Sequence, residues 1–144
     1  MKVDFYQLAG TPPEKVIAGL AEKLLASDGR LIIIADDENF LARLDRMLWD
    51  QGPSFLPHGL SGGADDASQP ILLSTSPDAP NVARNILIAD GVWRDSALSY
   101  DRAFFIFKSA VVADARAAWK SLRNKEGVER RYFAQEEGKW VVKG

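Results

Sequence analysis

Four short, continuous runs of apolar residues most constrain the fold of this chain. They are Arg30–Ala35, Ile71–Ser74, Asn85–Ala89 and Arg102–Phe107. A strand that is apolar on both faces must be covered on both faces, and in parallel sheets helices provide that cover. Segments with the helical spacing of apolar residues occur elsewhere in the chain. The pattern predicts an α/β fold of three layers, with a doubly wound, mostly parallel, Rossmann-like sheet.

The remaining segments supply the other elements of this fold. Further strands are expected at Lys2–Leu8 and, as a pair around the turn Glu137-Gly138, within Val128–Val142. Helices are expected from Thr11 as N-cap to Asp28-Gly29, over Glu38–Asp50, and over Ala110 to about Lys125 with Ser109 as cap. No repeat or linker divides the chain, so one domain over residues 1–144 is expected.

Composition narrows the classes of protein to consider. Apolar residues make up 47% of the 144 residues and charged residues 26%, which is ordinary for a globular protein. The absence of cysteine excludes disulfides, thiolate metal sites and cysteine nucleophiles. The N-terminus lacks the apolar run of a signal peptide, and no stretch approaches the roughly 20 apolar residues of a membrane span. We therefore expect a cytoplasmic protein without a membrane partner.

Charge is distributed unevenly along the chain. Residues 1–107 carry 9 Lys/Arg and 15 Asp/Glu, a net of −6, whereas residues 108–144 carry 9 and 5, a net of +4. The overall net charge of −2 argues against a protein built mainly to bind nucleic acid directly. The basic C-terminal part either attracts an acidic partner or a phosphate backbone, or is a solvated helix face.

Two adjacent acids, Asp36 and Asp37, follow the strand Arg30–Ala35. The carboxyl end of a strand is where α/β sheets place functional groups, so the pair could hold Mg²⁺ in a small enzyme, nucleotide-dependent or not, or in a receiver-like domain. The third acid and the lysine of a receiver domain are not evident. Aspartate also caps helices, and either residue precedes the helix that starts at Glu38. The capping role is the favoured interpretation.

The one histidine, His58, lies between Pro57 and Gly59. A single histidine excludes a two-histidine metal site, and no acid and nucleophile lie nearby in sequence. We expect His58 to bond backbone groups in a loop. The stretch Gly59–Gly63 lacks the Gly-Lys-Ser/Thr ending of a phosphate-binding loop, so no nucleotide site is supported.

The segment Leu44–Gly62 joins the end of a helix to an irregular stretch. The apolar residues of the helix are Leu41, Leu44, Leu48 and Trp49. Gly52 and Pro53 end this helix. The stretch that follows is too rich in proline and glycine to predict regular structure, and its large apolar residues are Phe55, Leu56, Pro57 and Leu60. These groups are either tucked under the domain or offered to a partner.

The helix from residue 110 carries a second candidate surface. Its core face is expected to comprise Val111, Ala115, Ala118 and Leu122. A neighbouring stripe comprises Val112, Arg116, Trp119, Lys120 and Arg123. Arg116 and Trp119 lie side by side, and this pairing suits a short acidic peptide ending in an apolar residue, because arginine can clasp a carboxylate. The same pair could stack a nucleic-acid base, or Trp119 could be buried and Arg116 merely solvated.

Several of these motifs together resemble the chi subunit of bacterial DNA polymerase III holoenzyme. The most specific part is residues 44–62, LDRMLWDQGPSFLPHGLSG. Weaker matches cover most of the chain: Phe5–Leu8, Leu31–Ala35, Asn85–Ile88 and Trp119–Arg123. The resemblance implies a doubly wound α/β fold and a non-catalytic accessory subunit of the clamp-loader assembly, without a cofactor. It also implies two faces that bind proteins.

The first implied face takes the acidic C-terminal tail of the single-stranded DNA-binding protein, which ends in Pro-Phe. Arg116 and Trp119 occupy the positions of the family's arginine and aromatic residue. Val112 stands where some members carry a lysine, and Lys120 or Arg123 is expected to compensate. We expect Trp140 or Val141, on the last strand, to form one wall of the pocket.

The second implied face takes the psi subunit, which tethers chi to the clamp loader. The resemblance places this face on the loop bearing Phe55 and Pro57, with Trp49 beside it. The segment Gly127–Glu137 is longer than in the compact versions of the family.

Overall fold

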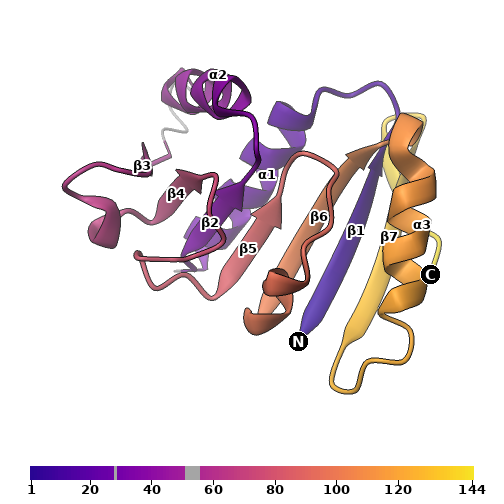
Figure 1. Cartoon of the computed structure of the whole chain (residues 1–144). Coiled ribbons are helices and arrows are strands. Elements are labelled where there is room, and N and C mark those ends of the chain that lie inside the picture. The colour runs from indigo at the N-terminus through magenta and orange to yellow at the C-terminus, as the bar shows by residue number, and fades with distance from the viewer. Residues whose placement is uncertain (28, 51–55) are drawn as a thin grey trace.

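A computed structural model of the chain describes residues 1–27, 29–50 and 56–144. In this part of the chain, eight strands form one sheet in the order β3-β4-β2-β5-β6-β1-β7-β8 (Figure 1). The strands are β1 (Lys2–Leu8), β2 (Leu31–Ile34), β3 (His58–Leu60), β4 (Ile71–Ser74), β5 (Asn85–Ile88), β6 (Arg102–Lys108), β7 (Glu129–Glu136) and β8 (Lys139–Val142). Every neighbouring pair is parallel except β7 and β8.

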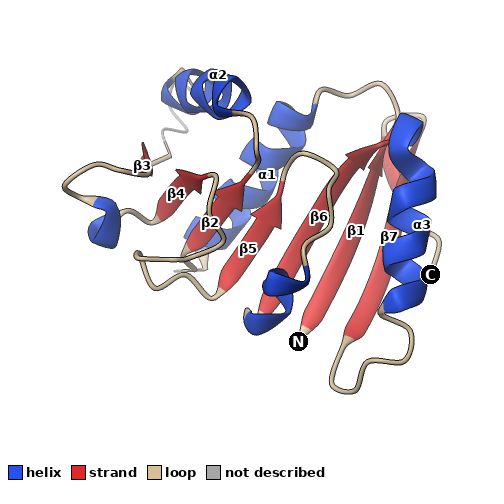
Figure 2. Ribbon diagram, in the orientation of Figure 1, coloured by secondary structure: helices blue, strands red, loops and turns tan. Residues whose placement is uncertain are grey.

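Helices cover both faces of the sheet, as Figure 2 shows. The described residues form three α-helices: α1 (Pro13–Ala26), α2 (Glu38–Trp49) and α3 (Val112–Ser121). Short 3-10 helices span Asp66–Ser68, Asp95–Ser99 and Ser109–Val111. The helices α1 and α2 pack with one hydrophobic cluster, and α3 and the 3-10 helix Asp95–Ser99 pack with a second cluster on the opposite face. The predicted three-layer, mostly parallel α/β fold is confirmed.

Strand β2 shows why the apolar runs form the centre of this sheet. All four of its residues are fully buried. Because successive side chains of a strand point to opposite faces, Leu31 and Ile33 join the cluster under α1 and α2. Ile32 and Ile34 join the cluster under α3. None of the helices that the structure describes is both long and apolar enough to cross a bilayer.

Two predicted helix starts are wrong. The N-cap of α1 is Pro12 rather than Thr11, because a residue that precedes a proline is held extended and the helix cannot begin before Pro13. The Thr11 hydroxyl instead accepts a hydrogen bond from Nε2 of Gln135, at 2.7 Å. A 3-10 turn at Ser109–Val111 precedes α3, which ends at Ser121, so Ser109 caps no helix and the helix is shorter than predicted.

The irregular stretch after α2 also differs from expectation. His58–Leu60 forms the edge strand β3, which pairs in parallel with β4. This segment is regular despite its proline and glycine content because His58 is buried and bonds backbone carbonyl groups. Nδ1 of His58 lies 2.6 Å from the carbonyl oxygen of Leu56, and Nε2 lies 3.1 Å from that of Asp45. The expected backbone-bonding role of this histidine is confirmed, although it lies in a strand rather than in a loop.

A buried carboxylate joins the three strands β6, β1 and β7. Asp4 is 0% exposed. It accepts a hydrogen bond from Arg102 at 2.8 Å and two from Arg131 at 2.9 Å. The two guanidinium groups also lie over the rings of Phe104 and Phe133. This cluster fixes β7 beside β1 and so positions the strand that forms one wall of the candidate site.

Candidate functional site

The apolar face of α3 packs on the sheet largely as the sequence predicts. Ala115, Ala118 and Leu122 are buried against it. Val111 is 37% exposed, so the prediction is wrong for this residue. It belongs to the 3-10 turn before the helix and does not share the helical periodicity.

Trp119 is half-buried, and its ring is held by three neighbours. Its ring centroid lies 5.3 Å from that of Phe5 and 5.5 Å from that of Tyr132, both edge to face. The guanidinium of Arg130 lies 4.0 Å from the ring centroid on its face. An aromatic ring fixed in this way presents its remaining surface without further loss of side-chain freedom.

The groove beside Trp119 is formed by α3 and the β7–β8 hairpin. Its volume is about 470 Å³, and it is lined by Gln7, Arg116, Trp119, Tyr132, Ala134, Gln135, Glu136 and Lys143. Arg116 is exposed, and its side chain forms no hydrogen bond or ion pair with any residue that the structure describes. Lys143 is paired with Glu136 at 2.6 Å. The guanidinium of Arg116 is therefore the positive group available to a ligand in this groove.

Tyr132 also lines this groove, although the sequence pattern did not predict it. Its hydroxyl donates a hydrogen bond to Oε1 of Gln7 at 2.6 Å. Burial raises the pKa of Tyr132, and the positive charge of Arg116 partly offsets that rise. The signal that could have found Tyr132 is the alternation of β7, which places Tyr132 and Ala134 on one face of the strand.

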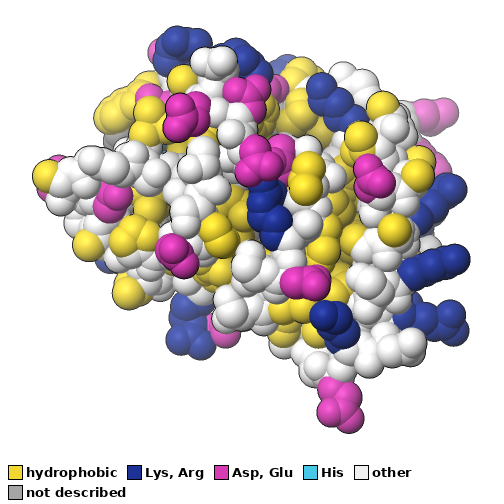
Figure 3. All heavy atoms as spheres, viewed as in Figure 1, with side chains coloured by type: hydrophobic (Ala, Val, Ile, Leu, Met, Phe, Trp, Pro, Cys, Tyr) yellow, Lys and Arg dark blue, Asp and Glu magenta, His cyan; other side chains and the backbone are white. Residues whose placement is uncertain are grey.

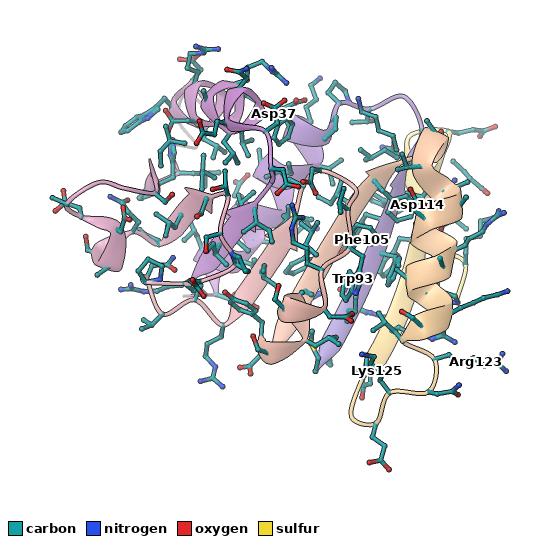
Figure 4. All side chains as sticks on the ribbon, viewed as in Figure 1. Asp37, Trp93, Phe105, Asp114, Arg123 and Lys125 are labelled. Carbon is teal, nitrogen blue, oxygen red and sulfur yellow. The ribbon has the colours of Figure 1, made fainter. Side chains whose placement is uncertain are left out.

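The other predicted residues of this site are dispersed. Lys120 on α3 and Arg123 in the turn that follows it are exposed but do not line the groove. Figure 4 shows Arg123 near the end of α3, pointing away from the sheet. Lys and Arg side chains gather along the edge of the molecule where α3 and β7 lie (Figure 3). These positive charges can attract an acidic ligand at longer range without contacting it.

The structure does not bring Trp140 to this groove. Trp140 contacts Tyr6, a member of the cluster under α1 and α2, with ring centroids 5.2 Å apart. It therefore lies on the face of the sheet opposite α3. Val141 pairs with Ala134, so its side chain is on the α3 face. Val141 is therefore on the same face of the sheet as the groove, but neither of the two expected wall residues is among those that line it.

The second expected face has two described members. Trp49 ends α2 and is 54% exposed, and Pro57 is exposed just before β3. The ring centroid of Trp49 lies 4.9 Å from that of His58, whose Nε2 lies 2.9 Å from a carboxylate oxygen of Asp45. Phe55 lies outside the described residues.

The two acids that follow β2, Asp36 and Asp37, have different roles. Asp37 is the N-cap of α2, and its carboxylate accepts a hydrogen bond from the backbone N–H of Asn39 at 2.9 Å. Asp36 pairs with Arg94 at 2.9 Å, and Arg94 also pairs with Asp90 at 2.8 Å. The capping interpretation is confirmed for Asp37. The arginine occupies the position where a cation would have to lie between Asp36 and Asp90.

Asp90 remains ionised in this cluster. Burial by itself raises the pKa of Asp90, but hydrogen bonds from Arg94 and from the backbone of Asp36 and Val92 outweigh it and hold the pKa below its usual value. Within the described residues, no group of three or more His, Cys, Asp or Glu side chains could hold a metal ion. The geometry gives no support to a magnesium-dependent enzyme at this edge of the sheet.

Comparison with protein families identifies the family to which the chain belongs. The model of the family described as DNA polymerase III chi subunit, HolC, matches residues 1–129 of the 144. The chain belongs to this family. Chi is an accessory subunit of DNA polymerase III, so the chain is a component of the DNA replication machinery. A comparison with curated proteins finds no match.

The residues matched by the chi family include only part of the groove. The match ends at Glu129, the first residue of β7, so it includes Arg116 and Trp119 but not the β7–β8 hairpin. One wall of the groove thus comes from the part shared with chi subunits, and the other comes from residues 129–144.

Proposed function

We propose that the chain is a non-catalytic, cytoplasmic accessory subunit of the clamp-loader assembly. It binds the acidic C-terminal tail of the single-stranded DNA-binding protein and thereby links that protein to the polymerase. The tail occupies the groove between α3 and the β7–β8 hairpin. This function requires no cofactor and no direct contact with nucleic acid.

The observation that carries this proposal is the pairing of Arg116 with Trp119 in an open groove. Arg116 has an unpaired, exposed guanidinium among the described residues, which can clasp the terminal carboxylate with two parallel hydrogen bonds. The half-buried ring of Trp119 provides an apolar surface for the final phenylalanine.

The charges outside the groove contribute to the encounter. Lys120 and Arg123 attract the acidic residues that precede Pro-Phe, and they replace the positive charge that is absent at Val112. Because these lysine and arginine side chains are exposed, salt screens their attraction, so the affinity for the tail falls as the ionic strength rises.

The psi subunit is the proposed partner of the second face. Trp49 and Pro57 are exposed near one another in the fold, at the end of α2 and the start of β3, and Phe55 is close to both in sequence. Exposed aromatic residues are typical anchors of protein interfaces. This face and the groove lie on different elements, so both partners can bind at once.

The proposal predicts that binding depends on a free terminal carboxylate. A labelled acidic peptide ending in Pro-Phe should bind with micromolar affinity, about −8 kcal/mol, in a fluorescence-anisotropy titration. The same peptide with an amidated C-terminus should bind much more weakly, because the carboxylate that Arg116 clasps has been removed. Equal affinity of the two peptides, or no binding of the free acid at low salt, would contradict the proposed site.

A further inference from the structure

A second groove lies on the opposite face of the sheet, between α1 and the β7–β8 hairpin. Its volume is about 420 Å³. The aromatic side of the groove is formed by Tyr6, Phe133 and Trp140. The Tyr6 ring stacks on that of Phe133 at 5.1 Å and meets that of Trp140 edge to face at 5.2 Å. Trp140 remains 38% exposed, so this aromatic surface is open to solvent.

The opposite wall is one face of α1. Val16 and Leu20 supply its apolar part, and Lys15 and Lys23 stand toward its two ends. No acidic residue is among the described residues that line the groove. Neither lysine side chain has a hydrogen bond or an ion pair with a described residue. The groove therefore combines apolar walls with positive charge that no acidic residue lining it neutralises.

Gly19 lies between the two lysines, in the interior of α1. Glycine destabilises a helix interior relative to alanine because it loses more conformational freedom on folding. Close packing does not account for it here, since a Cβ added to Gly19 would meet no described heavy atom within 4 Å. The backbone at Gly19 does not adopt a left-handed conformation either. Because Gly19 has no side chain, there is space beside it in the groove, and the backbone of a bound peptide can occupy that space.

We infer that this groove binds an acidic segment of a partner protein that carries an aromatic residue between two acids. The aromatic residue packs on Trp140 and Phe133 while its backbone passes Gly19. Lys15 and Lys23 are eight residues apart on one helix, about 12 Å at a rise of 1.5 Å per residue. In an extended peptide, residues four apart are separated by about 13 Å, so acids on either side of the aromatic residue reach the two lysines.

This groove is distinct from the one proposed for the tail of the single-stranded DNA-binding protein. It lies across the sheet from Arg116 and Trp119, and its two lysines are on α1, opposite the aromatic side chains. A segment in the interior of a partner protein, without a free C-terminus, can therefore bind in it. Its tryptophan, Trp140, reports on it separately from Trp119, because each indole N–H gives its own NMR signal.

The test uses the peptide acetyl-Glu-Asp-Ala-Phe-Ala-Asp-Glu-amide and the full chain labelled with ¹⁵N. Saturable movement of the Trp140 indole signal, with that of Trp119 unchanged, is the expected result. A peptide with lysine in place of each acid should not produce it. Failure of the acidic peptide to move the Trp140 signal, or equal binding of the lysine peptide, would overturn the inference.

Two variants test the space and the charge separately. Gly19→Leu fills the groove and should weaken binding by about tenfold or more, yet raise the melting temperature, because leucine is a better helix former than glycine. Opposite changes in affinity and stability exclude misfolding as the cause. Lys15→Glu with Lys23→Glu should also weaken binding, whereas Lys2→Glu, outside the lining, should not. Unchanged affinity in Gly19→Leu would overturn the inference even if the tail peptide binds beside Trp119.

Discussion

Replacing Asp4 with alanine is expected to lower the free energy of unfolding by about 3 kcal/mol. The carboxylate of Asp4 is fully buried and accepts three hydrogen bonds from Arg102 and Arg131. Its removal leaves two positive charges without a counter-ion between strands β6, β1 and β7. The loss is expected at the low end of the range for broken buried ion pairs, because both guanidinium groups are partly exposed and can turn toward water.

Urea unfolding at neutral pH measures this loss, and the chain contains a matched control. Asp101 forms an ion pair with Arg84, but both side chains are exposed. Asp101→Ala should leave the urea midpoint nearly unchanged, because exposed ion pairs contribute little to stability. If Asp4→Ala and Asp101→Ala gave the same small shift, the buried cluster would not be holding β7 to the sheet.

Replacing Arg116 with alanine is expected to weaken binding of the tail peptide by roughly tenfold to a hundredfold, the effect of losing a charge-assisted hydrogen bond. The side chain of Arg116 is exposed and has no partner among the described residues, so the stability of the fold should not change. The affinity is measured by anisotropy titration with the free-acid peptide.

Two further variants separate contact from general attraction. Arg123→Ala removes the same charge from the turn that follows α3, but Arg123 does not line the groove, so its effect should be much smaller and should vanish at high salt. Arg116→Lys keeps the charge but not the planar fork and should recover only part of the affinity. If Arg116→Ala and Arg123→Ala had equal effects, attraction at long range would account for the binding.

Elements that depend on neighbouring residues were predictable from the sequence. The continuous apolar run at Leu31–Ile34 predicts a strand that is buried on both faces, and β2 is such a strand. The turn at Glu137 and Gly138 is also local, since both residues adopt positive φ, 51° and 75°, as a tight hairpin requires. The cap at Asp37 depends only on the next turn of its own helix.

Elements that depend on distant segments were not predictable in this way. β3 is three residues long, and its pairing with β4 and the burial of His58 against α2 stabilise it. The partners of Asp4 lie 98 and 127 residues away. No local pattern around Asp4 distinguishes a buried carboxylate from an exposed one.

The candidate site shows the same division. A spacing of three residues on a helix places Arg116 beside Trp119, and the structure confirms that both line one groove. The face on which each residue of β8 lies depends on the register of β8 on β7, which pairs Val141 with Ala134 and places Trp140 on the other face. A shift of one residue in that register would exchange their positions, so composition alone could not assign their faces.

The central claim is that the tail of the single-stranded DNA-binding protein binds beside Trp119, and the tryptophan indole N–H signals test it most directly. The four tryptophans include Trp49 at the second face, Trp119 in the tail groove and Trp140 on the opposite side of the sheet. Titration of the ¹⁵N-labelled chain with the free-acid peptide ending in Pro-Phe should move the Trp119 signal and leave those of Trp49 and Trp140 in place. Saturable binding that moves the Trp140 or Trp49 signal while the Trp119 signal stays fixed would contradict the account.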